Sequence, residues 1–102
     1  MRLYTLDGRF NLCGKRVREA RIKAGMSQDT LAAKLQLAGL QIGQMAVSRI
    51  ETGKRVVPDF ELPVIAGVLG VSTDWLLGKE KTSLLHSREV FFDGLTFRLN
   101  QL

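Results

Sequence analysis

The chain has 102 residues, of which 45% are hydrophobic, and its formal net charge at neutral pH is +5. This length fits one compact domain, and this hydrophobic fraction excludes a compositionally disordered chain. The single cysteine, Cys13, excludes a disulfide-stapled fold, and no stretch approaches the ~20 apolar residues that span a bilayer. The positive charge favours a polyanionic partner such as nucleic acid or a membrane surface. Without a signal-peptide pattern, we expect a cytoplasmic protein.

The first segment, residues 1–11, alternates apolar and polar side chains around Asp7-Gly8. An Asp-Gly pair within such a pattern is a strong signal of a two-residue hairpin turn. We therefore expect a short hairpin or an ordered arm ahead of a helical region at residues 12–78.

Helical periodicity begins after this segment. It runs from about Asn11 to Ala24, and Gly25 is placed to end this first helix. Ser27 is a good N-cap for a second helix beginning at Gln28, because its hydroxyl can accept a hydrogen bond from a free backbone N–H. The apolar side of the first helix is expected to comprise Leu12, Val17, Ala20, Ile22 and Ala24.

The second and third helices each place apolar residues on one face. Leu31 and Leu35 share a face of the second helix, and Val47 and Ile50 form an apolar pair on the third. The third helix is expected from about Gln44 to Thr52. Its other side is polar, and a basic turn follows it, so this helix is suited to contact with nucleic acid.

Two further helices complete the predicted body. A fourth is expected from about Phe60 to Leu69, with its cap near Asp59 and Phe60 on its apolar face. A short fifth helix over residues 74–77 is capped by Ser72 or Thr73. Five short helices around one core make this part of the protein all-α.

The last segment, residues 79–102, has a different pattern. It begins as a linker and then alternates apolar and polar residues around Asp93-Gly94. We expect a short β-hairpin here that needs a partner, because an isolated two-stranded hairpin is marginal in water. The partner is either the N-terminal segment or the same element of a second subunit.

Three blocks of this sequence resemble a known family. They are VREARIKAGMSQDTLA at residues 17–32, VSRIETGKR at 47–55 and LGVSTDWLLG at 69–78. In this order and spacing they resemble the helix-turn-helix domains of the lambda and 434 repressors and Cro, often called the XRE family. The resemblance implies a five-helix, lambda-repressor-like domain that binds double-stranded DNA as a sequence-specific transcriptional regulator.

The connection between the second and third helices departs from the family pattern. Residues 36–43 make it several residues longer than in most members. We expect the second helix to continue through Ala38, with Leu40 and Ile42 packing into the core and Gly43 near the N-cap of the third helix. The insertion leaves the docking angle of the third helix undetermined.

The third helix carries the residues that are expected to contact bases: Gln44, Met45, Ser48 and Arg49. A glutamine can make a bidentate contact with adenine and an arginine with guanine, and each is worth ~1–3 kcal/mol of discrimination. Met45 either touches a thymine methyl group or packs against the protein. Ser48 is short enough to serve a base, a sugar or a phosphate.

Phosphate contacts are expected from two places. Ser27 and Gln28 lie at a helix N-terminus, where free N–H groups and the helix dipole favour an anion, although Ser27 acts mainly as the cap. Lys54 and Arg55 follow the third helix and can approach the DNA backbone on its other side.

The resemblance also implies an ion pair between Arg21 and Glu51, which would fix the third helix without touching DNA. It further implies repression by a homodimer. Trp75 is interpreted as core or as part of a dimer surface together with the C-terminal hairpin. Two alternatives remain: an antitoxin-like protein whose residues 90–99 bind another polypeptide, and a scaffold without a DNA function.

Nothing in the sequence favours catalysis. The single histidine, His86, has no evident carboxylate or nucleophile partner, and Cys13 on its predicted helix is expected to be buried. There is no glycine-rich phosphate loop and no Cys/His spacing for zinc. We expect neither an enzyme nor a bound metal or cofactor.

Overall fold

A computed structural model describes residues 5–79 of the chain, and this part contains helices but no strand. The all-α prediction is confirmed. The predicted C-terminal hairpin and His86 lie outside the described residues. In chain order the elements are α1 (Gly14–Lys23), α2 (Gln28–Leu37), α3 (Gln44–Glu51), the 3-10 helix η1 (Asp59–Glu61), α4 (Leu62–Leu69) and α5 (Thr73–Leu76).

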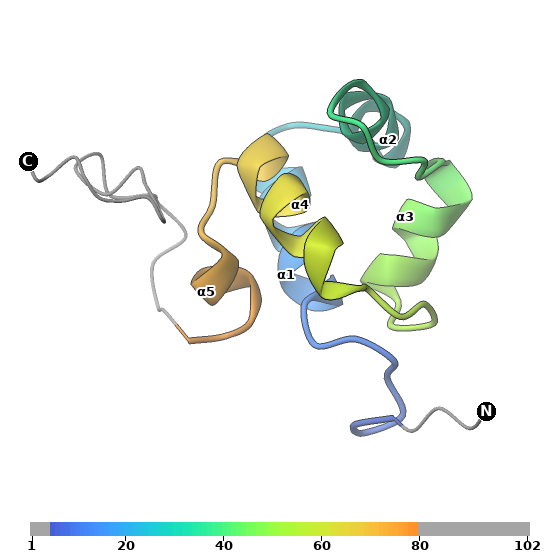
Figure 1. Cartoon of the computed structure of the whole chain (residues 1–102), viewed down its shortest axis with the longest axis vertical. Helices are drawn as coiled ribbons and strands as arrows, with labels where there is room; N and C mark the ends of the chain where they lie inside the picture. Colours follow the sequence, from blue (N-terminus) through green and yellow to red (C-terminus); the bar gives the residue numbers. More distant parts are fainter. Residues whose placement is uncertain (1–4, 80–102) are drawn as a thin grey trace, which may run out of the picture.

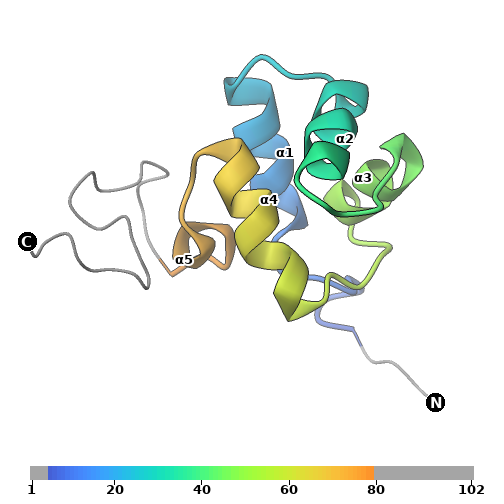
Figure 2. The same ribbon diagram turned by 45° about the horizontal axis from the view of Figure 1, so that its top comes forward.

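The helices pack against one another in one cluster and do not form separate layers. α1 and α4 lie next to each other, with α2 and α3 on one side of this pair and α5 on the other (Figures 1 and 2). α3 contacts both α1 and α2. The third helix is therefore held from two sides and still has an outward face. Among the described residues, no helix is long and apolar enough to cross a membrane.

The N-terminal segment forms a tight turn ahead of α1. Asp7 and Gly8 have φ values of 53° and 78°, and Leu6 and Arg9 exchange two backbone hydrogen bonds of 3.0 Å. Positive φ at both central residues is the geometry that Asp-Gly favours in a two-residue hairpin. A single antiparallel bridge is the extent of the pairing in the described part.

α1 begins at Gly14, with Cys13 as its N-cap, and not at Asn11, whose side chain binds the first helical residue. Its Oδ1 accepts a 2.8 Å hydrogen bond from the Gly14 backbone N–H. The predicted apolar face of this helix is partly wrong, since Leu12 and Ile22 are more than half exposed. Val17 and Ala20 are buried as predicted, Ala24 is exposed, and Cys13 just ahead of the helix adds to the buried side.

The long connection between α2 and α3 is accommodated by extra contacts with α2. The helix ends at Leu37, and Gly39 takes a φ of 102°, a conformation that glycine adopts without strain. The side chain of Gln36 donates to the carbonyl of Ile42 at 3.1 Å, and Ile42 is buried in the core. Leu40 also packs against the core, so the inserted residues are anchored to the fold.

The predicted start of the fourth helix is wrong in one respect. η1 precedes α4, and Phe60 is 68% exposed, because the 3-10 turn over Asp59–Glu61 directs its ring away from the core. α5 is capped by Ser72, whose Oγ accepts a 2.9 Å hydrogen bond from the backbone N–H of Trp75.

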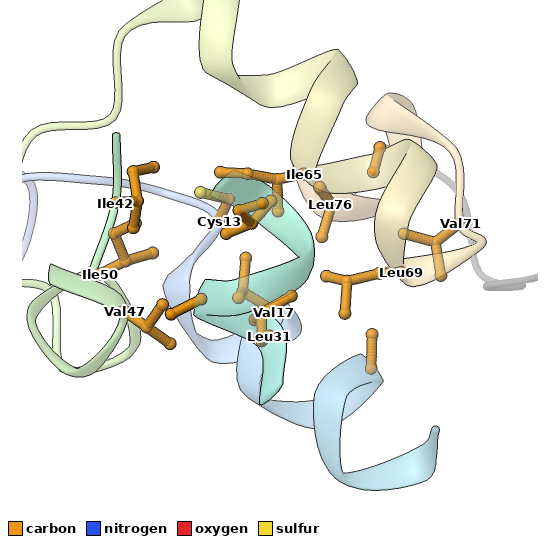
Figure 3. Packing of buried hydrophobic residues seen from close by; sticks show 14 of the residues in the cluster. Cys13, Val17, Leu31, Ile42, Val47, Ile50, Ile65, Leu69, Val71 and Leu76 are labelled. Atoms are coloured by element: carbon orange, nitrogen blue, oxygen red, sulfur yellow. The ribbon is translucent and has the colours of Figure 1, made fainter. Parts of the chain in front are cut away.

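One apolar core joins all five helices (Figure 3). Trp75 belongs to it with an exposed fraction of only 3%, and the guanidinium of Arg16 lies 4.8 Å from the centre of its ring. Arg16 also donates to the Trp75 carbonyl at 2.9 Å, which ties α1 to α5. The indole is therefore covered within the chain, and a dimer surface built on it is not supported.

Candidate nucleic-acid interface

α3 presents two different faces. Its buried residues are Val47, Ile50 and Glu51. On the opposite side, Met45 and Arg49 are exposed, and Gln44 and Ser48 are half-buried beside them. The four predicted base contacts are thus on one outward side of a helix whose other side is fixed in the core.

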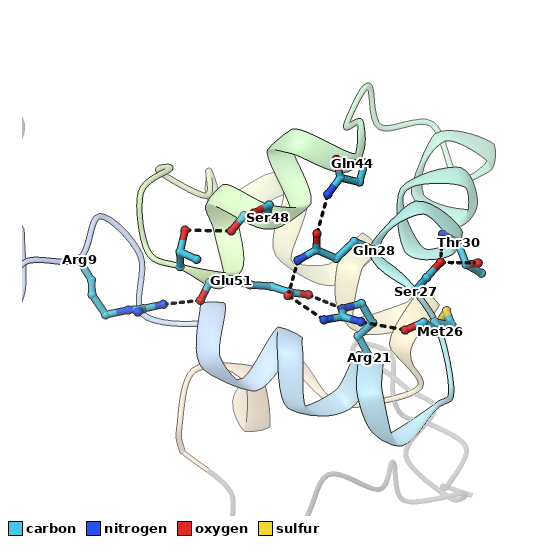
Figure 4. A network of polar contacts seen from close by, with 10 residues as sticks. Arg9, Arg21, Met26, Ser27, Gln28, Thr30, Gln44, Ser48 and Glu51 are labelled. Carbon is cyan, nitrogen blue, oxygen red and sulfur yellow. Dashed lines mark hydrogen bonds and ion pairs between the residues drawn. The ribbon is translucent and has the colours of Figure 1, made fainter.

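Arg21 and Glu51 form an ion pair between α1 and α3 (Figure 4). Nε of Arg21 lies 2.6 Å from Oε2 of Glu51, and Nη2 donates to Oε1 at 3.0 Å. The third donor, Nη1, binds the carbonyl of Met26 at 2.9 Å. The Glu51 hydrogen bonds raise the pKa of Arg21, and the side chains are 11% and 2% exposed. This bidentate pair connects α1, the turn before α2 and the end of α3.

Gln28 extends this arrangement to the outward face of α3. Its Nε2 donates to Oε1 of Glu51 at 3.0 Å, and its Oε1 accepts a 2.6 Å hydrogen bond from Nε2 of Gln44. A carboxylate can only accept, so the Gln28 amide must turn its nitrogen to Glu51 and its oxygen to Gln44. Arg21, Glu51, Gln28 and Gln44 therefore form one ordered polar network, which orients the first side chain of α3.

The amide of Gln44 keeps one donor and its acceptor after this contact. Its carbonyl oxygen and its second N–H take no part in the bond to Gln28. A donor and an acceptor side by side are what a bidentate contact with adenine requires. The polar network thus holds Gln44 in a state that is suited to adenine.

The four predicted phosphate contacts differ in their surroundings, and the amide of one of them, Gln28, is bound to Glu51 and Gln44 in the polar network. Ser27 caps α2, because its Oγ accepts from the Thr30 N–H at 3.0 Å. Lys54 is exposed and has no side-chain partner among residues 5–79. Arg55 instead binds Glu61 through two contacts of 2.8 and 3.2 Å, which raise the pKa of Arg55. Lys54 is therefore the cation of this turn that is available to a phosphate.

A shallow depression lies between α3 and the turn that follows it. It is lined by Gly43, Met45, Ala46, Arg49, Lys54 and Arg55. Arg49, like Lys54, has no ion pair within the described part of the chain. Positive charge thus gathers beside the outward face of α3.

Comparison with known proteins agrees with this geometry. The sequence model of the helix-turn-helix family matches residues 17–76, from within α1 to the end of α5. The chain belongs to the XRE-type helix-turn-helix family. It is also similar to the HTH-type transcriptional regulator ImmR of Bacillus subtilis (strain 168), with 40% identity over 70 residues. The matched region is 69% of this chain, which spans about half the length of that curated relative (51%).

In this XRE-type domain, the N-terminal segment makes contacts that the sequence did not predict. Nη2 of Arg9 donates to the carbonyl of Glu51 at 3.1 Å (Figure 4). Nδ2 of Asn11 donates to the carbonyls of Ile50 and Arg55 at 2.9 and 2.8 Å. Both residues precede the part of the chain that the family model matches, and no local motif could have indicated contacts across some forty positions.

The described residues offer little for other chemistry. Cys13 is buried, and desolvation raises its pKa to about 11, so its thiol stays protonated at neutral pH. No group of three or more His, Cys, Asp or Glu side chains within residues 5–79 could hold a metal ion.

Proposed function

We propose that this helix-turn-helix protein binds specific sites on double-stranded DNA through α3 and regulates transcription. The observation that carries the proposal is the outward side of α3, where polar and cationic side chains stand on a helix anchored by a buried apolar face. A helix with this arrangement fits the major groove, in which every base pair has a distinct pattern of donors and acceptors. The name of the Bacillus relative, a transcriptional regulator, supports the same function.

In this proposal, specificity comes mainly from Gln44 and Arg49. Gln44 is oriented by the polar network and is half-exposed, and its amide keeps a donor and an acceptor that match adenine. Arg49 lies more than one turn further along α3, is exposed, and suits guanine or a phosphate. Met45 has 65% of its surface exposed, which supports a contact with a thymine methyl group.

Affinity that does not depend on sequence would come from the groups around α3. Lys54 approaches the phosphates from the turn after the helix, and the start of α2 adds backbone N–H groups and positive dipole. Contacts of this kind set the register of the protein on the duplex and make the affinity fall with salt.

We further propose that the protein acts as a repressor and binds as a homodimer. Both statements rest on the family resemblance, since a dimer of such domains places two recognition helices about one helical turn apart on DNA, roughly 34–36 Å. In this proposal the dimer contact lies in residues 79–102, where the sequence pattern predicts a hairpin that needs a partner, and it does not involve Trp75, which is covered within the chain.

The experiment that tests this function is selection of duplexes from a random pool by the purified full chain at two salt concentrations. An enriched, near-palindromic site would support a dimeric, sequence-specific regulator and would give the half-site spacing. Retention without enrichment would contradict specificity, and no retention at low salt would contradict DNA binding and favour the protein-partner role of residues 90–99.

A further inference from the structure

The C-terminal end of α3 is bound by residues that come before α1. The last carbonyls of a helix lack partners within the helix, and they need donors from elsewhere. Here Asn11 binds the carbonyl of Ile50, and Arg9 binds that of Glu51. The backbone N–H of Phe10 also donates to the carbonyl of Gly53 at 2.8 Å. Three consecutive residues thus bind the end of α3 and the turn beyond it.

Asn11 is the centre of this arrangement. Its amide nitrogen donates to two carbonyls, one in α3 and one at Arg55, while its oxygen accepts from the N–H of Gly14. One side chain therefore joins the start of α1, the end of α3 and the basic turn. Arg55 is the next residue after Lys54. The hydrogen bond from Asn11 to the Arg55 carbonyl therefore fixes the backbone beside the Lys54 side chain.

The residues before and at the start of α1 also pack closely against the end of α3 and its turn. A Cβ atom on Gly14 would lie 2.0 Å from the carbonyl oxygen of Ile50, and one on Gly53 would lie 2.7 Å from Cζ of Arg9. Glycine at both positions lets the backbone of one segment approach the other. The guanidinium of Arg9 also lies near the negative end of the α3 dipole, where a cation is favourable.

We propose that Arg9 and Asn11 are positioning residues for DNA binding, which hold the C-terminal end of α3 and the Lys54 turn in a fixed relation. The polar network holds α3 through the side chains of Gln44 and Glu51, whereas Arg9 and Asn11 bind backbone carbonyls at its C-terminal end. Base contacts and phosphate contacts can then be made together, because both depend on one rigid helix and its turn. The inference rests on the proposed function, and its two residues lie outside the part that the family model matches.

The central variant is Asn11→Ser. A serine hydroxyl can still accept from the Gly14 N–H, as capping residues do, but it has no amide to reach the carbonyls of Ile50 and Arg55. The control is Ile65→Val, a loss of core volume on α4, a helix whose main contacts are with η1, α1, α2 and α5. Arg9→Gln removes the long guanidinium and its charge together.

The first readout needs no DNA. The N–H groups of Gly53 and Lys54 donate to the carbonyls of Ile50 and Arg49 at 3.1 and 2.8 Å, so their hydrogen exchange reports on the end of α3. We expect Asn11→Ser to raise exchange at these two amides by about tenfold relative to amides of α2, and Ile65→Val to cause no such selective change. Equal changes in the two variants would overturn the proposal.

The second readout is the ratio of affinities for the selected site and a random duplex, measured where each variant is fully folded. We expect Asn11→Ser and Arg9→Gln to reduce this ratio by about tenfold, and Ile65→Val to leave it unchanged. A fall in the salt slope of about one for Arg9→Gln, with the ratio unchanged, would make Arg9 a direct phosphate contact and overturn its positioning role.

If the wild type selects no site, the proposed function fails as well. If it selects one and Asn11→Ser keeps the ratio, only this inference fails.

Discussion

Gln28 donates its side-chain N–H to Glu51 across 3.0 Å, and this contact determines which way the Gln28 amide faces. The carboxylate is itself bound by Arg21, so it cannot turn to accept elsewhere. Gln28 must then offer its oxygen to Gln44. A buried ion pair thus determines the orientation of a side chain on the outward face of α3.

Replacing Gln28 by methionine tests this relationship. Gln28→Met keeps the length of the side chain and leaves the Arg21–Glu51 pair intact, but it removes the partner that orients Gln44. We expect discrimination at the base pair that Gln44 contacts to fall by ~1–3 kcal/mol, with other base pairs less affected. Affinities for single-base variants of the selected site measure this. The control is Gln41→Met, at an exposed glutamine outside the network; the same loss there would contradict the argument.

Base and phosphate contacts should respond differently to truncation. Gln44→Ala and Arg49→Ala are expected to lower affinity for the selected site by ~1–3 kcal/mol each and to change random-duplex binding little. Lys54→Ala is expected to weaken binding to all sequences alike and to reduce the salt slope by about one. Binding isotherms on both duplexes at several salt concentrations separate these cases. Equal losses on both duplexes for all three variants would refute the assignment of α3 as the recognition helix.

Loss of Arg21 should mainly affect stability. Arg21→Met leaves the Glu51 carboxylate, 2% exposed, without its charged partner. We expect the free energy of unfolding to fall by ~3–5 kcal/mol, because an uncompensated buried charge is costly. Arg18→Met on the exposed side of α1 removes the same charge and should change it by no more than ~0.5 kcal/mol. Urea unfolding of both variants measures the two changes in the free energy of unfolding. Similar changes would show that other groups compensate the charge of Glu51.

The sequence predicted the order of the helices and most of their ends, because the signals involved are local. Ser27 caps α2 through its own neighbour Thr30, and Gly70 ends α4 with a φ of 72°. Such contacts span only a few positions. The apolar pair Val47 and Ile50 likewise identified the buried side of α3 from its spacing alone.

Other features depend on contacts between distant segments. The contacts of Asn11 with α3 arise only when the chain is folded, and periodicity contains no signal for them. A continuous helix from Phe60 would put its ring on an apolar face, but the chain forms a 3-10 turn there before α4 begins. The way in which α3 docks after the long connection could not be predicted from the sequence either. In the structure, a hydrogen bond from the Gln36 side chain to the Ile42 carbonyl anchors that connection.

Two glycines in helices should respond to alanine in opposite ways. Gly14→Ala places a Cβ where the Ile50 carbonyl oxygen lies only 2.0 Å away, so α1 and α3 must separate. We expect a loss of ~1–3 kcal/mol in unfolding free energy despite the better helix propensity of alanine. Gly67→Ala on α4 meets no atom within 4 Å and should gain ~0.4–1 kcal/mol. Thermal unfolding decides this, and a stabilised Gly14→Ala would show that the two helices are not in close contact.

The thiol of Cys13 should make stability depend on alkaline pH. Burial raises its pKa to about 11, above the ordinary value of 9.0 that applies in the unfolded chain. The folded state therefore binds the proton more tightly, so this contribution is complete below about pH 9 and is lost as the pH rises towards 11. A shift of this size corresponds to roughly 2–3 kcal/mol. Cys13→Ala removes the titrating group, so the stability difference between wild type and variant should be constant up to about pH 8 and then shrink. A difference that stays constant to pH 11 would mean that the thiol ionises as easily in the folded protein as in the unfolded one.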